Sequence, residues 1–99
     1  MSIDIGEISA SELKERLDRG EHPIILDVRE PWEVELARVA GATHIPMGDI
    51  PARISEIDDS REIVVMCHHG VRSAQVAMYL ARNGFDRVSN LSGGIEAWS

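Results

Sequence analysis

Two kinds of apolar pattern follow one another along the chain. Short segments rich in apolar or β-branched residues predict strands at residues 24–28, 43–45, 63–66 and 88–91. Apolar residues at helical spacing predict helices after Ser9, from Pro31 to about 37, near 51–58 and across 71–83, with a last turn at 94–98. Strands separated by helices favour parallel pairing through right-handed crossovers. The predicted fold class is α/β, with helices on both faces of a mostly parallel sheet of about five short strands.

Polar residues indicate where some of these helices begin. Ser9 and Glu12 have the spacing of a capping box, and Asp49 is a candidate cap for the helix near residue 51. The helix across 71–83 carries only two charged side chains, so we expect it to be largely buried. Packing anchors are predicted at Trp32 and Trp98.

Length and composition narrow the class of protein. Ninety-nine residues, 43% hydrophobic and 27% charged, predict one globular domain over residues 1–99. The net charge of −7 argues against nucleic acid and anionic membranes as partners. No apolar run reaches membrane-spanning length, and the N-terminus lacks the basic and apolar regions of a signal peptide. The lone cysteine excludes an internal disulfide, so we expect a cytoplasmic protein.

That cysteine, Cys67, lies where the apolar run 63–66 ends and a predicted helix is about to begin. Unpaired N–H groups and the helix dipole would lower the pKa of its thiol there. The alternative is a small packed side chain. Gly70 permits a curled loop, Arg72 supplies a forked cation and Ser73 supplies a hydroxyl or a helix cap, so a reactive thiolate at the sheet's rim is favoured.

Other polar residues lie near the same edge. Ligands of parallel sheets bind beyond the carboxyl ends of the strands, where Asp27 and Arg29 would line the rim or form a structural ion pair. His68 and His69 could raise the local positive potential or contact the substrate, but as adjacent residues they are expected to point apart. One cysteine and two adjacent histidines do not make a closed tetrahedral set, so no metal site is predicted.

Three stretches of the chain resemble the rhodanese (thiosulfate sulfurtransferase) family: residues 26–33, 67–73 and 91–98, with 41–46 at a matching place. The resemblance implies a three-layer fold and a persulfide on catalytic Cys67. It implies substrate contacts from the rest of the loop, namely Arg72, His68, His69, Gly70, Val71 and Ser73. It requires no cofactor. Residues 37–40 depart from the family pattern, and the chain stops just past Trp98, earlier than many relatives.

Cysteine phosphatases are the rival class, but they place five residues between cysteine and arginine, where this chain has four, residues 68–71. A smaller ring of amides fits one sulfur better than a phosphoryl group. We therefore expect sulfane sulfur to move from a small anionic donor such as thiosulfate to cyanide, a thiol or a partner protein. A sulfur-relay or regulatory module is the alternative.

Overall fold

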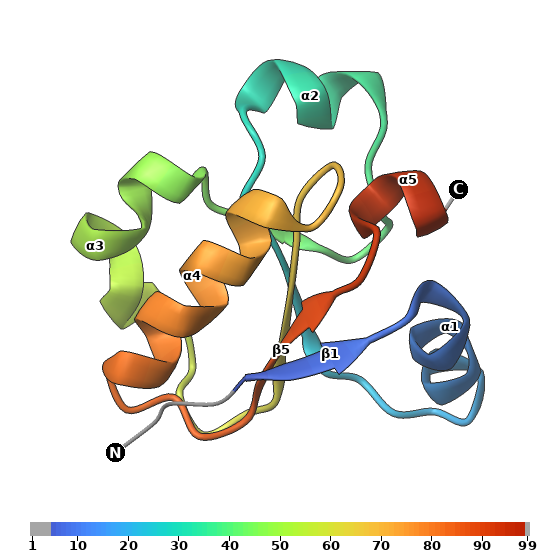
Figure 1. Ribbon diagram of the computed structural model, residues 1–99, viewed down its shortest axis with the longest axis horizontal. Helices are drawn as coiled ribbons and strands as arrows, with labels where there is room; N and C mark the ends of the chain where they lie inside the picture. Colours follow the sequence, from blue (N-terminus) through green and yellow to red (C-terminus); the bar gives the residue numbers. More distant parts are fainter. Residues whose placement is uncertain (1–4, 99) are drawn as a thin grey trace.

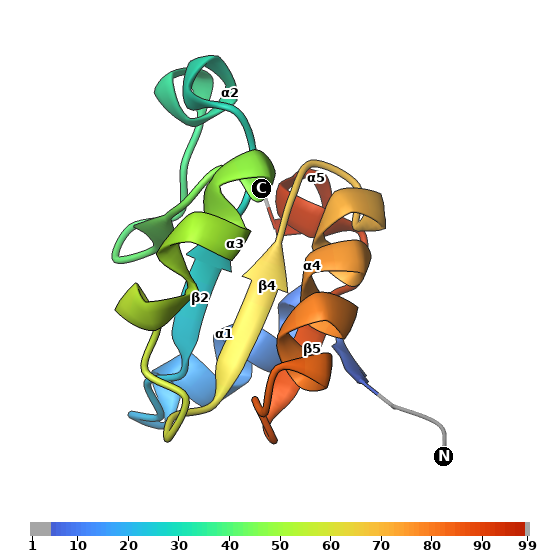
Figure 2. The ribbon, with the colours of Figure 1, turned by 90° about the vertical axis from the view of Figure 1, so that its left-hand side faces the viewer.

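Five strands form one parallel sheet in the computed structural model, which describes residues 5–98 (Figures 1 and 2). The order across the sheet is β1–β5–β4–β2–β3. The strands are β1 (Gly6–Ile8), β2 (Ile24–Asp27), β3 (Thr43–His44), β4 (Ile63–Met66) and β5 (Val88–Leu91). The predicted α/β class is confirmed, and the sheet is parallel at every pairing.

All helices except the last lie between strands along the chain, as the alternating pattern predicts. They are α1 (Ala10–Asp18), α2 (Pro31–Leu36), α3 (Ile50–Arg53), α4 (Val71–Arg82) and α5 (Gly94–Trp98), with single 3₁₀ turns η1 (Met47–Asp49) and η2 (Ile54–Glu56). The capping box at Ser9 and Glu12 is confirmed, with the Glu12 N–H donating to Ser9 Oγ at 3.1 Å. Asp49 stands at the cap position of α3, but its side chain makes no capping hydrogen bond.

Alternation along the central strand β4 divides the core between two layers. Ile63 and Val65 belong to one cluster with Val76 and Leu80 of α4, whereas Val64 and Met66 belong to the cluster on the opposite face. Figure 2 shows α3 and α4 in front of the sheet and α1 behind it. Burial on both faces explains why β4 is a continuous apolar run.

Three expectations need correction. The exposed edge strand β1 is absent from the predicted strands because it has three residues, of which only Ile8 is buried. Helix α4 is not largely buried, since it buries four side chains and leaves Val71 70% exposed. Trp32 is 63% exposed and is no anchor, whereas Trp98 does pack against the core.

The carboxyl ends of β2 and β4 lie side by side. Asp27 is in register with Met66, and the Val28 N–H donates to the Met66 carbonyl at 3.0 Å. Cys67 directly follows Met66, the last residue of β4. Helices α2 and α5 both lie beyond this end of the sheet (Figure 2), so they surround the segment that carries the cysteine.

Candidate active site

Cys67 is placed by the alternation of β4. It follows Met66 and faces the same layer as Val65, in the cluster that also contains Val76 of α4. Its exposure is 1%, which corrects the expectation of a thiolate open at the rim. Burial alone would fit a small packed side chain, so the polar contacts of the sulfur decide between the two interpretations.

Those contacts are hydrogen bonds directed at the sulfur. The Gly70 N–H lies 3.1 Å from Sγ, and the Ser73 hydroxyl lies 3.3 Å from it. Burial, the largest single influence, raises the pKa of the thiol. The Ser73 hydroxyl and the N–H groups of Ser73, Gly70 and His69 together outweigh burial, so the pKa of Cys67 lies below its ordinary value. The surroundings of this buried sulfur therefore favour the thiolate.

The loop can curl around the sulfur because of Gly70. Its φ of 107° lies in the left-handed region, where a side chain would be strained. Its N–H turns inward to the sulfur, while its carbonyl accepts bonds from the Ala74 N–H and from Asn90 Nδ2, both at 3.2 Å. Gly70 thereby joins the strand to the first turn of α4.

Helix α5 holds the other side of the loop. The Ile95 N–H donates to the Cys67 carbonyl at 2.9 Å, and the Glu96 N–H donates to the His68 carbonyl at 3.2 Å. The C=O and N–H of a trans peptide point in opposite directions. Because the His68 carbonyl is directed at α5, the N–H of the same peptide, which belongs to His69, is directed at the sulfur. Gly94 permits the close approach, since a Cβ there would lie 2.4 Å from both carbonyl oxygens.

The sequence left two roles open for Ser73, a hydroxyl donor or a helix cap, and Ser73 is not the cap. Gly70 occupies the cap position, and Ser73 lies in the first turn of α4, fully buried. Its hydroxyl can donate to Cys67 Sγ or to Asn90 Oδ1. Asn90 of β5 was not singled out from the sequence, where it is one polar residue within a predicted strand.

Arg72 is paired with a residue that the sequence analysis did not single out. Its two terminal nitrogens lie 2.6 and 2.8 Å from the carboxylate oxygens of Glu33 on α2. Both terminal nitrogens of Arg72 therefore donate to Glu33. Hydrogen bonds from Arg72 lower the pKa of Glu33 to about 2. Glu33 lies within the matching stretch 26–33, which was its only sequence signal.

The Asp27–Arg29 pair positions α2. Both side chains are buried, and Arg29 Nη2 lies 2.8 Å from Asp27 Oδ2. Arg29 also donates to the carbonyl oxygens of Glu33 and Ala37 at the end of α2. The pair thus anchors the helix that carries the Arg72 partner.

The outer surface of the loop is formed by His68, His69 and Val71, all exposed. The two imidazoles do not point apart: their ring centroids are 4.2 Å apart. Next to His68, a cavity of about 150 Å³ extends to α2 and α5, with Trp32, Leu36 and Ile95 among its lining residues. Within residues 5–98, His68, His69 and Glu96 carry ligand atoms close enough together to hold a metal ion.

A parallel sheet with a hydrogen-bonded cysteine sulfur at its carboxyl edge defines a class of α/β domains suited to cysteine-based group transfer. Within that class, the chain belongs to the rhodanese-like domain family, which it matches over residues 9–99. The resemblance and the three-layer fold expected from it are thereby confirmed.

Known proteins agree with this assignment. A sulfurtransferase of Allochromatium vinosum is 40% identical over 95 residues, covering 96% of this chain and 89% of that protein. The crystal structure of a rhodanese-like domain protein from Staphylococcus aureus has a TM-score of 0.91 at 34% identity, covering 96% and 92%. An NAD-dependent persulfide reductase from A. fulgidus has a TM-score of 0.77 at 35% identity, covering 96% of this chain and 16% of that chain. No helix within residues 5–98 is long and apolar enough to cross a membrane.

Proposed function

We propose that this protein is a sulfurtransferase that carries sulfane sulfur as a persulfide on Cys67. The Cys67 thiolate attacks the outer sulfur of a donor such as thiosulfate. A sulfur–sulfur bond forms at Cys67 while the donor's own sulfur–sulfur bond breaks, and sulfite leaves with the electron pair. A thiol, a partner protein or cyanide then attacks the outer sulfur, which restores the thiolate.

The observation that carries this proposal is the set of hydrogen bonds on the sulfur. Donors from Gly70 and Ser73 meet Sγ at 3.1 and 3.3 Å, and the pKa of the thiol is lowered despite its burial. Groups that stabilise a thiolate also stabilise the negative charge of a persulfide. Family membership and the similarity to a persulfide reductase support the same chemistry.

Burial limits how a donor reaches the sulfur. Since Cys67 is 1% exposed, the attack requires a path through the loop, and the loop's exposed side carries His68, His69 and Val71. We assign donor entry to this side. Arg72 contributes its positive charge in the proposal, while two of its five N–H groups donate to Glu33. The Cys67 thiolate is among the groups that raise the pKa of Arg72, after the hydrogen bond to Glu33.

The loop length supports sulfur over phosphate. Four residues separate Cys67 from Arg72, and the N–H groups of this short loop are directed at Sγ, which favours a bound sulfur over a larger phosphoryl group. A phosphoryl group would need donors for its three non-bridging oxygens, and a general acid for the leaving group. Asp27, the acidic residue at the end of β2, is buried and bound to Arg29.

The test is the mass of the protein after incubation with thiosulfate. We expect a gain of one sulfur atom on Cys67, removed by cyanide with formation of thiocyanate, and no gain in Cys67→Ser. An unchanged wild-type mass, or hydrolysis of an aryl phosphate in its place, overturns the proposal. A gain that persists in Cys67→Ser contradicts the assignment of the nucleophile.

A further inference from the structure

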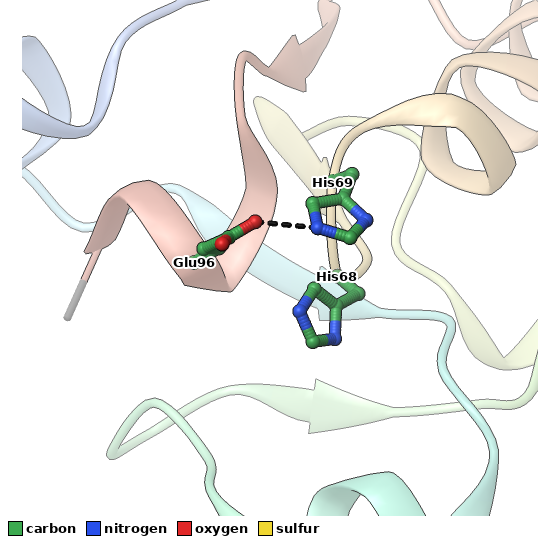
Figure 3. Close-up of side chains that lie close together, drawn as sticks. All are labelled: His68, His69 and Glu96. Carbon is green, nitrogen blue, oxygen red and sulfur yellow. Dashed lines mark ion pairs between the residues drawn. The ribbon is translucent and has the colours of Figure 1, made fainter.

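Three side chains of metal-ligating types meet on the outer surface of the loop, two of them adjacent in the sequence and the third distant. His68 and His69 follow Cys67, and Glu96 belongs to α5. Figure 3 shows both imidazoles beside α5, with the Glu96 carboxylate directed at His69, to which it is paired. One ligand atom from each residue lies within 4.8 Å of the others.

The backbone holds this arrangement in place. The Glu96 N–H donates to the His68 carbonyl at 3.2 Å, so the segments that carry the three side chains are joined directly. The Ile95 N–H makes a second link to Cys67, and Gly94 allows the contact because it has no Cβ. Since the two segments are already assembled, a ligand would only need to select rotamers of exposed side chains, and its binding would cost little reorganisation.

The three side chains offer a set of ligand atoms that suits transition-metal ions. Two imidazole nitrogens and one carboxylate oxygen are the protein ligands of open zinc sites, in which a fourth position stays available to water or another ligand. Imidazole-containing sites favour Zn²⁺, Cu²⁺ and Ni²⁺ over Mg²⁺ or Ca²⁺. The carboxylate of Glu96 and the net charge of −7 also favour a cation at this surface.

We propose that His68, His69 and Glu96 form a binding site for a divalent transition-metal ion of the Zn²⁺ type. The ion takes one nitrogen from each imidazole and one oxygen from Glu96, and replaces any proton shared between His69 and Glu96. The site is separate from the sulfur, because Cys67 faces the α4 layer and is buried whereas the three ligands are exposed. The proposal does not depend on the sulfurtransferase assignment.

Titration of the full chain, without a histidine tag, with Zn²⁺ near neutral pH tests this site by calorimetry. We expect saturable binding of one ion per chain. His69→Ala and Glu96→Gln should each weaken Zn²⁺ binding by at least about tenfold. Even the removal of a residue that only hydrogen-bonds to a metal ligand lowers metal affinity by about 10–100-fold. His22→Ala is the matched control, because His22 is an exposed histidine before β2, at the opposite end of the sheet. The affinity of this variant for Zn²⁺ should equal that of wild type.

Cys67→Ser separates the site from a thiolate-bound metal, and it should bind Zn²⁺ as wild type does. Loss of binding in Cys67→Ser overturns the proposal, as does wild-type affinity in both His69→Ala and Glu96→Gln. Absence of saturation up to about 1 mM Zn²⁺ also overturns it. Circular dichroism verifies the folding of every variant, including Cys67→Ser at its buried position; the substitutions of the exposed side chains should preserve the fold.

Discussion

Replacing Ser73 with alanine tests whether the buried hydroxyl stabilises the Cys67 thiolate. The hydroxyl lies 3.3 Å from Sγ and is the strongest of the influences that lower the thiol's pKa against the effect of burial. Hydrogen bonds to charged groups contribute about 1.5–3 kcal/mol. Because the one hydroxyl proton is also within reach of Asn90 Oδ1, we take the lower end of this range.

At that lower end, Ser73→Ala should reduce the thiolate-to-thiol ratio below the pKa by about tenfold, since about 1.4 kcal/mol corresponds to that factor. The assay is the rate of Cys67 alkylation by iodoacetamide as a function of pH, followed by mass spectrometry. The profile should move to higher pH. The plateau rate at high pH should stay near that of wild type, because the substitution does not block access to the sulfur.

Ser60→Ala is the control for this experiment. Ser60 is exposed and precedes β4, at the opposite end of the strand from Cys67, so its alkylation profile should match wild type. The Ser73 variant should also lose about 1–3 kcal/mol of stability, because Asn90 Oδ1 loses its hydroxyl donor. A Ser73→Ala profile that coincides with wild type would refute the reasoning and assign the hydroxyl proton to Asn90 alone.

Two further predictions concern the residues that hold the loop. The Glu33 pKa of about 2, lowered from 4.5 by Arg72, means that the carboxylate stabilises the fold fully above about pH 4.5 and loses this contribution as the pH falls toward about 2. Denaturant midpoints should therefore favour wild type over Glu33→Gln near neutrality, with the difference closing in acid; a constant difference would exclude the ion pair as its source. Gly94→Ala should cost at least about 2 kcal/mol, since its φ is +60° and a Cβ would lie 2.4 Å from two carbonyl oxygens. Gly48→Ala, with nothing within 4 Å, should stay within about 0.5 kcal/mol of wild type; equal midpoints for the two alanine variants would contradict the role given to Gly94.

Local patterns predicted most helices and strands, because the residues that determine each of these elements lie within the element itself. The run Ile63–Met66 is apolar at each position since both faces of β4 are covered, and the capping box at Ser9 depends on residues three apart. The predicted helix at 71–83 was correct within one residue at its end. Its burial was overestimated because uncharged residues were taken to be core positions, whereas Val71 and Tyr79 are exposed.

The partners of the loop were beyond the reach of local patterns. Arg72 donates to Glu33, which is 39 positions away, and Ser73 donates to Asn90, which is 17 positions away. These pairs form because α2 and β5 arrive at the same edge of the sheet. Their side chains carry no periodic signal that would set them apart from solvent-exposed polar residues.

By itself, the sequence determined that a cysteine stands between a buried strand and a helix, followed by a glycine that can adopt a left-handed conformation. Strand, turn and helix are consequences of short-range sterics and apolar spacing, so the edge of the sheet at which Cys67 stands could be read directly. The tertiary structure decided that the sulfur is buried, that Arg72 is directed at Glu33, and that Glu96 joins the two histidines. These outcomes depend on where α2 and α5 pack, which is set by long-range contacts that no neighbouring residues encode.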